Sequence, residues 1–346
     1  MKLFVGLDIS LKDTQVCLVD ADGNIVREKK VPTEPEAIGQ MLAKDAKRIV
    51  RVGFEASSLS PWLGVELRKL GFPALIVEAR HMKSALNAMR NKTDKNDARG
   101  IAQMMRTGWF REVHIKSHES HKLRILLTNR RMLKRKFLDI ENAIRGTLKV
   151  FGVKMCASTR GKFEEDLREK LQNEDPMLRE MTECMLLARR TLLEEFNKCH
   201  RLVMRAAREN NVCRQFMTIP GVGPVTSLAV MTAIDDPLRF RRSKTVGAHF
   251  GLTPKRYQSG TTDNDGRISK CGDPQVRTLL VEAATSILCR VQKRFSLQAW
   301  GHKIHRRSGF KRAVVAVARK LAVIMHRMWM DGTEFRFARL ETRAAA

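Results

Sequence analysis

The chain has 346 residues, of which 43% are hydrophobic and 29% are charged, and its excess of Lys and Arg gives a formal net charge of +28. A chain of this length predicts about two or three domains. The apolar content is that of a globular protein, which excludes a disordered basic tail as the source of the charge, and a charge excess of this size favours a polyanionic partner such as nucleic acid.

The sequence predicts neither a membrane protein nor a secreted one. No segment approaches the roughly 18 to 20 apolar residues that a membrane span needs, and Asp8 interrupts the apolar run at the N-terminus. The seven cysteines include no Cys-x-x-Cys pair, so they fit neither a disulfide framework nor a thiolate zinc site. We expect them to be reduced, mostly core residues of a cytoplasmic protein.

Residues 1–115 are predicted to form an α/β domain, because short β-rich runs alternate with helical ones. The segment Asp20–Asn24 places an Asp-Gly pair between two strand-like runs, which is typical of a hairpin turn and predicts a meander of the first three strands in a mixed sheet. The expected strands span residues 3–7, 14–19, 24–31, 48–54 and 74–77, and the expected helices span residues 34–44, 60–70 and the part from 79 onward.

Residues 116–210 are predicted to form a mainly helical coiled-coil region, because Pro and Gly nearly vanish and apolar residues recur at heptad-like spacing. Two long antiparallel helices are the economical interpretation. Between His121 and Phe137 there are seven Lys or Arg and no acid, which is typical of a solvated helix face or of a nucleic-acid track. The expected core positions are Leu123, Leu126, Leu133, Phe137, Ile140, Ile144 and Phe151 on the first helix, and Leu178, Met181, Met185, Leu192, Cys199 and Leu202 on the second.

Residues 211–335 are predicted to form a mainly α C-terminal domain, followed by a tail at 336–346. The turn Ile219-Pro-Gly-Val-Gly before a helix indicates a helix-hairpin-helix element, in which Gly221 and Gly223 let backbone N–H groups approach a phosphate. A plain turn with a glycine cap is the alternative. Between Arg290 and Arg327 there are eleven Lys or Arg and no acid, which predicts a positive surface.

Four acids in the N-terminal domain are candidate metal ligands. Asp94 and Asp97 are three residues apart and share one face of a helix; the alternative is a helix start with Asp94 as N-cap and Asp97 in the first turn. Asp8 ends the first expected strand and Glu55 ends the fourth, where carboxylates can project from a sheet edge. Such oxygen ligands suit Mg²⁺ or Mn²⁺, and two ions about 4 Å apart can activate a nucleophile and stabilise a leaving oxygen.

An acid on strand one, a three-strand meander, an acid on strand four and an acidic pair on a later helix form a ribonuclease H-like order. With the surrounding GLDIS and KTDKNDARGIA, these acids resemble those of the DEDD transposases of insertion sequences related to the Piv DNA invertase. The N-terminal domain of that family is similar to the RuvC Holliday-junction resolvase. The resemblance covers nearly the whole chain and implies catalytic roles for Asp8, Glu55, Asp94 and Asp97.

The segment from Gly251 to Gly272 resembles the C-terminal transposase domain of the same family, in which the serine of a Ser-Gly pair is the nucleophile. The resemblance places that role on Ser259. From the residues alone, a Ser before Gly is more often a turn residue, and Ser269 and Tyr257 remain alternative nucleophiles. Nearby cations can hold a phosphate and ease alkoxide formation. These cations are Lys255, Arg256, Arg267 and Lys270.

The resemblance implies a bacterial, nucleoid-associated recombinase that cleaves DNA by serine attack, forms a covalent protein–DNA link and exchanges strands through a junction. It also implies a structured noncoding guide RNA that pairs with donor and target DNA, so that base pairing reads sequence while the protein binds backbone and shape. Apolar heptad positions on long helices need a partner within the chain or across subunits. We expect a dimer or tetramer.

Three other functions are considered. The first is a metal-dependent junction nuclease in which the four carboxylates activate water and Ser259 is structural. The second is an actin-like sugar or acetate kinase, because GLDIS followed by a hairpin also opens that fold; the positive charge and the lack of a second Asp-x-Gly loop count against it. The third is a purely architectural nucleic-acid-binding protein, which four suitably placed acids disfavour.

Two further patterns are interpreted as structural. His114, His118 and His121 have a spacing that a helix can use for a transition metal, but a solvated segment between two domains is the preferred interpretation. A stripe at helical spacing is interpreted as core rather than as a binding site. Its members are Met104, Met105 and Trp109.

Overall fold

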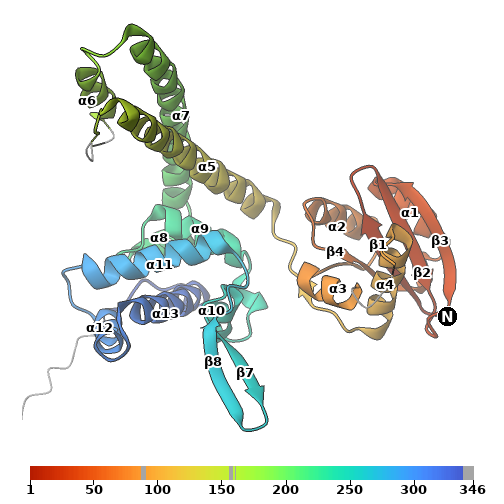
Figure 1. Ribbon diagram of the computed structural model, residues 1–346. Coiled ribbons are helices and arrows are strands. Elements are labelled where there is room, and N and C mark those ends of the chain that lie inside the picture. Colours follow the sequence, from red (N-terminus) through yellow and green to blue (C-terminus); the bar gives the residue numbers. More distant parts are fainter. Residues whose placement is uncertain (87–90, 156–158, 160, 338–346) are drawn as a thin grey trace, which may run out of the picture. The chain divides into compact units, whose positions relative to one another are not determined.

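The computed structural model describes residues 1–86, 91–155, 159 and 161–337 and divides the chain into two compact units, Met1–Lys116 and Ser117–Ala346 (Figure 1). The coiled-coil and C-terminal regions, which the sequence analysis separates after residue 210, therefore lie in one unit. No helix in the described part of the chain is long and apolar enough to cross a membrane. Cys156 and the tail from residue 338 onward lie outside the described residues.

The first unit contains the expected mixed sheet, with strand order β3-β2-β1-β4-β5-β6. Strands β1, β2 and β3 form the antiparallel meander, whereas β4 pairs parallel to β1 and β5 pairs parallel to β4. The Asp20 carboxylate accepts hydrogen bonds from two backbone N–H groups of the predicted turn, those of Asp22 and Asn24. The strands are β1 Leu3–Ile9, β2 Asp13–Val19, β3 Ile25–Pro32, β4 Ile49–Glu55, β5 Ala74–Val77 and β6 Glu112–Val113. The ribonuclease H-like fold prediction is confirmed.

The two faces of this sheet are covered by different helices, because successive strand residues point to opposite faces. On one face, Leu3, Val5 and Leu7 share a core cluster with Ile38 of α1 and Leu63 of α2. On the other face the core is built from α3 and α4. These helices are α1 Pro35–Ala43, α2 Ser60–Lys69, α3 Ala79–Leu86 and α4 Asp94–Thr107.

The predicted antiparallel helix pair is present at the start of the second unit, where α5 (His118–Thr147) packs against α7 (Pro176–Glu209) and the short α6 (Phe163–Lys170) lies between them in sequence (Figure 1). The direction of α7 follows from contacts whose residue numbers rise on one helix as they fall on the other. These contacts join Glu141 to Arg189, Phe137 to Phe196, and Arg130 to His200.

The core register predicted for α7 is wrong at three positions, because Met181, Met185 and Leu202 are 50%, 38% and 47% exposed. The buried seam lies at seven-residue spacing and contains two polar residues, so an apolar pattern could not find it. Its members are Thr182, Arg189, Phe196 and Val203. On α5, Phe137 and Ile144 are buried as expected, whereas Phe151, which follows the helix, is 56% exposed.

The C-terminal part of the second unit is built around α9, whose residues from Thr226 to Ile234 are all buried. A two-stranded hairpin, β7 and β8, projects from this helical body (Figure 1). The remaining elements are α8 Asn211–Met217, α9 Pro224–Ile234, α10 Val246–His249, β7 Pro254–Ser259, β8 Thr262–Ile268, α11 Pro274–Cys289, α12 Ser296–Ser308 and α13 Phe310–Asp331.

Two burial predictions need correction. Of the described cysteines only Cys17 and Cys213 are buried, so the expectation of mostly core cysteines is wrong. Met104 and Met105 belong to the core as expected, but Trp109 is 67% exposed. The Trp109 ring packs against that of His81 in a T-shaped arrangement, outside the core, because Gly108 has ended α4 before this position.

Candidate active site and nucleic-acid interface

Asp8 and Glu55 lie beside each other at one edge of the sheet. The parallel pairing of β1 with β4 places Leu7 opposite Phe54, and the next residue on each strand is the acid. Parallel strands end at the same edge, so the two carboxylates leave the sheet together. The sequence prediction that these acids lie at the ends of the two strands is confirmed: Glu55 is the last residue of β4, and Asp8 is the last but one of β1.

Two glycines place α4 directly over these acids. Gly6 and Gly53 are paired across β1 and β4, and each lies two residues before an acid, on the same face of its strand. A Cβ atom at Gly6 would lie 2.2 Å from the carbonyl oxygen of Ala98, and one at Gly53 would lie 2.2 Å from the sulfur of Met105. At Gly6 the backbones of β1 and α4 are in contact, which only glycine permits, whereas at Gly53 the space is filled by the Met105 side chain. This close packing brings the first turn of α4 to the strand ends.

The first turn of α4 carries Asp94 and Asp97. The N-cap is Thr93, whose hydroxyl accepts a hydrogen bond from the backbone N–H of Asn96 at 3.2 Å, so the alternative of Asp94 as N-cap is wrong. Asp94 is exposed and Asp97 is half-buried. Because Thr93 already caps the N-terminus of α4, neither carboxylate is needed as the helix cap.

The four acids interact electrostatically. Burial, as the largest cause, and the negative charges of Asp97, Asp94 and Glu55 together raise the pKa of Asp8 from 3.8 to about 6, with Lys92 opposing them. Burial also raises the pKa of Glu55, where Lys92 again opposes the shift and Asp97 adds to it. The structure thus brings all four predicted acids within electrostatic reach, and it adds Lys92, to which the sequence analysis gave no role.

The donor set fits a divalent cation such as Mg²⁺ or Mn²⁺. Carboxylate oxygens are the ligands that these ions prefer. The pKa of Asp8 is raised first by burial and then by the three neighbouring carboxylates, and a bound cation would offset both effects. Within residues 1–86, 91–155, 159 and 161–337, no three His, Cys, Asp or Glu side chains already converge as ligands. Binding would therefore require side-chain rotation, and the same finding gives no support to a metal site at His114, His118 and His121.

Ion pairs and hydrogen bonds hold α4 at this position. The Arg99 guanidinium binds both carboxylate oxygens of Glu28 on β3, at 2.5 and 2.8 Å, and this contact lowers the pKa of Glu28. The Gln103 amide donates to the carbonyl of Gly23 at 2.8 Å. The acidic turn is thus fixed to the meander as well as to β1 and β4.

Ser259 lies in the second unit, at the tip of the β7–β8 hairpin. It pairs with Thr262, and Gly260 between them has a positive φ of 55°. Every residue of β7 is exposed. The tip thus presents a serine hydroxyl to solvent, and the turn role that the residues alone suggest is also fulfilled.

The predicted phosphate-binding cations differ in their availability. Lys255, Arg267 and Lys270 are exposed, whereas Arg256 forms a bidentate ion pair with Asp263 across the hairpin and thereby lowers the pKa of Asp263.

The two alternative nucleophiles also lie on this hairpin or at its root. Tyr257 is 62% exposed, and its ring lies so close to Gly266 that a Cβ there would be 3.1 Å from it. Ser269 follows β8, is half-buried, and accepts a long hydrogen bond of 3.4 Å from the N–H of Cys271. Of these hydroxyls, only that of Ser259 lies at the tip.

The two glycines of the predicted helix-hairpin-helix element have different surroundings. They lie in the turn between α8 and α9, where Gly221 has a φ of 85° and packs against Ile287 of α11. Gly223 is the N-cap of α9, and a Cβ there would meet nothing within 4 Å. Gly221 is exposed and Gly223 is half-buried, and the geometry is compatible both with a helix-hairpin-helix element and with a plain turn.

A broad basic surface covers the end of the second unit. All eleven Lys and Arg between residues 290 and 327 are exposed. On α5, Arg124 forms an ion pair with Asp273 at 2.5 Å and Arg130 lies over the ring of Phe196, so these two cations stabilise the fold. The exposed cations of the predicted α5 track are Lys122, Arg131, Lys134, Arg135 and Lys136.

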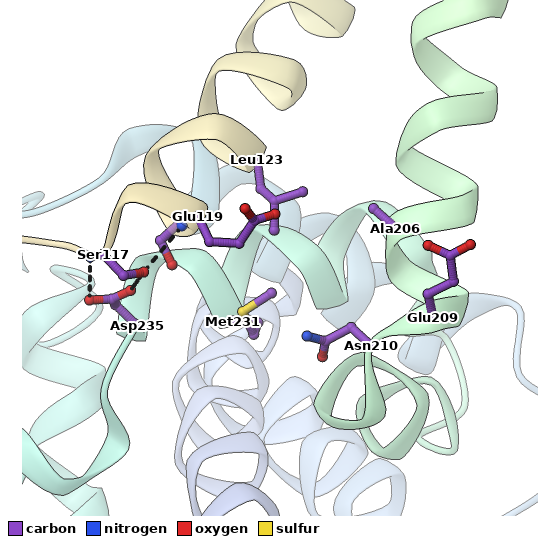
Figure 2. A pocket seen from close by; sticks show the side chains of 9 residues that line it. Ser117, Glu119, Leu123, Ala206, Glu209, Asn210, Met231 and Asp235 are labelled. Carbon is purple, nitrogen blue, oxygen red and sulfur yellow. Dashed lines mark hydrogen bonds between the residues drawn. The ribbon is translucent and has the colours of Figure 1, made fainter.

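An acidic pocket, opposite in charge to the basic surface, lies where α5, α7 and α9 meet (Figure 2). It is lined by Glu119, Glu209 and Asp235, so it disfavours phosphate. Asp235 has a positive φ of 63°, and its carboxylate accepts hydrogen bonds from the N–H and hydroxyl of Ser117 at 3.0 and 2.6 Å. These contacts fix the first residue of the second unit.

Comparison with known proteins decides the family. Residues 213–299 match the profile of the Transposase IS116/IS110/IS902 family, and residues 5–152 match a second transposase profile, DEDD_Tnp_IS110. The chain belongs to this transposase family. The recognition of a DEDD insertion-sequence transposase is thus confirmed. The profile matched by residues 5–152 covers the carboxylate cluster, and the profile matched by residues 213–299 covers the Ser259 hairpin.

Relatives of this transposase extend over most of the chain. It is 28% identical over 327 residues to the transposase for insertion sequence element IS1111A of Coxiella burnetii, covering 93% of this chain and 88% of the relative. It is 25% identical to a probable family 20 transposase of Pseudomonas aeruginosa, covering 93% and 95%. A RuvC structure from Thermus thermophilus is similar over 32% of this chain and 99% of that chain, at 15% identity and a TM-score of 0.25.

Proposed function

We propose that this transposase cleaves and rejoins DNA with a divalent metal held by Asp8, Glu55, Asp94 and Asp97 and with Ser259 as the nucleophile. The observation that carries the proposal is the meeting of the β1 and β4 ends with the first turn of α4, which gathers four carboxylates. A fold does not need such a cluster of like charges, which costs stability. The cost is offset when a cation binds.

The metal, when bound, would lower the free-energy cost of deprotonating a nucleophile and stabilise the leaving oxygen. The residues of the chain have separate tasks. The carboxylates would bind and orient the metal in their ionised form. Because the pKa of Asp8 in the metal-free chain is about 6, metal binding below that pH would have to displace its proton. Lys92 interacts with both Asp8 and Glu55, and its positive charge partly offsets the negative charge of the cluster when no metal is bound.

In the proposed cleavage step the Ser259 Oγ forms a bond to phosphorus, the bond between phosphorus and the leaving sugar oxygen breaks, and a covalent protein–DNA ester remains. A serine hydroxyl needs help to lose its proton at neutral pH. Asp263 is a poor base because its ion pair with Arg256 lowers its pKa. We therefore assign proton removal to the carboxylate cluster of the first unit.

We further propose that the DNA partners, donor and target, are accompanied by a structured noncoding guide RNA. What supports this is the extent of exposed positive charge on α12, α13 and α5, which exceeds what a short duplex contact requires. Binding dominated by phosphate contacts should weaken steeply between 50 mM and 500 mM salt, because counterions are released. Unchanged binding over that range, or no discrete RNA enriched with the protein from cells, would contradict the proposal.

The nucleophile is tested with a suicide DNA substrate that traps the protein–DNA ester. Digestion and mass spectrometry of the adduct should place the DNA on the peptide that contains Ser259. Ser259→Ala should abolish the adduct, whereas Tyr257→Phe and Ser269→Ala should retain it. DNA found on Tyr257 or Ser269 would show that the wrong residue has been named.

A metal-dependent junction nuclease is the second candidate. The observation that favours it is that all four carboxylates lie in the first unit, so the cluster needs no residue of the second. In that case DNA would be cut by water, Ser259→Ala would cleave at the native rate, and no adduct would form with any variant. The trapping experiment therefore separates the two candidates.

We also propose a dimer or tetramer that acts on nucleoid DNA in the bacterial cytoplasm, with its active sites completed either within one chain or between chains. Mixing a Ser259→Ala chain with an Asp8→Asn chain distinguishes these arrangements. Restored activity indicates sites shared between subunits, whereas no restoration indicates pairing within one chain. Light scattering with DNA and RNA bound tests the assembly itself, and a monomer would contradict it.

A further inference from the structure

The hairpin that carries Ser259 has almost no contact of its own with the rest of the unit. Residues Pro254–Asn264 are all exposed, so only the root of the hairpin fixes its direction. From the root to Ser259 the strand runs about six residues, or roughly 20 Å. A tilt of about 10° at the root would move the serine by about 3 Å, which is as long as a hydrogen bond.

The root is a tight crossing of two backbone segments. A Cβ at Gly251 would lie 2.3 Å from the carbonyl oxygen of Cys271, and one at Gly272 would lie 2.1 Å from that of His249. Both glycines have a positive φ, of 66° and 73°. Lys270 between them also has a positive φ, of 54°, which is strained for a residue with a side chain. The surroundings must therefore hold this conformation in place.

Arg277, in α11, joins the two segments of this crossing. Its Nη1 donates to the carbonyl of Phe250 at 3.0 Å, just before the hairpin, and to the carbonyl of Cys271 at 2.9 Å, just after it. Phe250 is fully buried in the helical core. One guanidinium thus ties the hairpin's entry and exit to the same turn of a helix.

The start of α11 is fixed in turn to α5. Asp273 caps α11 by accepting from the N–H groups of Gln275 and Val276, and it also accepts an ion pair from Arg124 of α5 at 2.5 Å. Burial opposes ionisation of Asp273 and is the largest single effect on it. The hydrogen bond and charge of Arg124, together with the backbone N–H groups of Val276 and Gln275, outweigh burial and hold the pKa below its ordinary value. The support behind Arg277 therefore extends to the long helix that begins the second unit.

We infer that Arg277 is the positioning residue of the proposed nucleophile: it sets the angle of the hairpin and so the place where Ser259 meets the scissile phosphate. This inference rests on the proposed role of Ser259. It assigns Arg277 no contact with DNA and no part in metal binding. Because misplacement of a reacting group by about 1 Å can cost about 100-fold in rate, loss of Arg277 should act on the covalent step and leave DNA affinity intact.

The experiment compares Arg277→Met and Arg277→Lys in the full chain, with Arg179→Met as matched control, since Arg179 is an exposed arginine of α7 in the same unit. At saturating DNA, Arg277→Met should lower the first-order rate of adduct formation about 10- to 100-fold, with the DNA dissociation constant within twofold of native. Arg277→Lys, which retains a cationic donor, should recover part of the rate. Arg179→Met should match the native chain.

Hydrogen exchange supplies a readout that does not depend on the serine. The N–H groups of Ser269 and Lys270 bond across the root, to the carbonyls of Thr253 and Gly251. In Arg277→Met these two amides should exchange faster, while the amides of α13 stay protected. A native adduct rate in Arg277→Met overturns the inference, and so does loss of α13 protection together with the root, which would mean a general folding defect.

Failure of the proposed function would give results different from failure of the inference about Arg277. If the native chain forms no adduct, or if Ser259→Ala still forms one, the serine assignment falls and the inference falls with it. If Ser259→Ala abolishes the adduct while Arg277→Met forms it at the native rate, only the inference is overturned. Should Arg277→Met fail to fold, a native rate in Arg277→Gln, with the root amides exchanging faster, would overturn it in the same way.

Discussion

At the scale of single residues, Asp8 shows what the carboxylate cluster costs. Its folded-state pKa of about 6 lies above the ordinary value of 3.8, so between about pH 4 and pH 6 the native state holds a proton that the unfolded chain has lost. The free energy of unfolding must then fall as the pH rises through this window. Above it, without metal, the ionised carboxyl destabilises the fold.

Asp8→Asn should therefore stabilise the metal-free protein at pH 7.5, by an amount of order 1 kcal/mol once solvent screening is allowed for. The gain should vanish at pH 4, where Asp8 is protonated in the native state. Added Mg²⁺ or Mn²⁺ should raise the melting temperature of the native chain more than that of the variant. Urea unfolding with EDTA at both pH values checks this, and a variant less stable than native at pH 7.5 would contradict it.

The acids of this site are predictable from the sequence, whereas the residues that bring them together are harder to find. Asp8 and Glu55 follow apolar strands, and Asp94 and Asp97 share a helix face, so strand ends and spacing suffice. The contribution of Gly6 and Gly53 depends on how closely α4 approaches the sheet. A Gly-x-acid pattern repeated on two strands was a signal available in the sequence. The sequence contains no comparable signal for Arg277, because its two acceptors are backbone carbonyls.

At the scale of elements, the close packing of α4 on β1 predicts that a single added methyl group lowers both stability and activity. Gly6→Ala would force the backbones apart, since its Cβ would meet Ala98 and Ala102 atoms at 2.2 and 2.4 Å. We expect a loss of about 2 to 3 kcal/mol in the free energy of unfolding, together with loss of DNA cleavage as Asp97 moves away from Asp8. Urea unfolding and the trapping assay measure the two effects.

Gly146→Ala is the matched control for this prediction. Gly146 lies within α5, and a Cβ there would meet nothing within 4 Å, so the substitution should stabilise the chain by about 0.5 to 1 kcal/mol. Equal effects of the two substitutions would show that the contact between α4 and β1 is less close than described.

The seam of the α5–α7 pair predicts a second, larger effect. Arg189 is only 2% exposed and binds Glu141 at 2.8 Å and Glu164 at 3.0 Å. Arg189→Ala would leave the buried Glu141 with only its longer ion pair, to Arg145 at 3.7 Å, at a cost of up to about 3 to 5 kcal/mol. Arg189→Met combined with Glu141→Leu should recover much of that loss, and urea unfolding of the native chain and the two variants decides. If the double substitution is as destabilising as Arg189→Ala, the ion pair is not the cause.

This seam also shows which properties of a long helix an apolar repeat predicts and which it does not. The existence and direction of both long helices follow from the apolar repeat and the lack of Pro and Gly. The register of α7 does not, because its buried positions include Thr182 and Arg189, while Met181 and Met185 beside them are exposed. At these positions the buried face lies one residue beyond the one that hydrophobicity alone selects, and it contains the ion pair of Arg189 with Glu141.

At the scale of the whole molecule, the two units carry different parts of the proposed chemistry. The first unit holds the carboxylates, and the second holds Ser259, the exposed cations and the long helix pair. Composition and charge predicted the nucleic-acid partner, and motif order predicted the fold of the first unit. The projecting hairpin was not expected, because its exposed strands lack the apolar alternation that identifies a buried sheet.

The central claim is that the carboxylates and Ser259 act in one step, and metal-dependent trapping of the protein–DNA ester tests it most directly. The rate of adduct formation is measured for the native chain, Asp8→Asn and Ser259→Ala, each with EDTA and with added Mg²⁺ or Mn²⁺. The account predicts an adduct only for the native chain and only with metal. An adduct formed at the native rate by Asp8→Asn, by Ser259→Ala, or by the native chain in EDTA would contradict it.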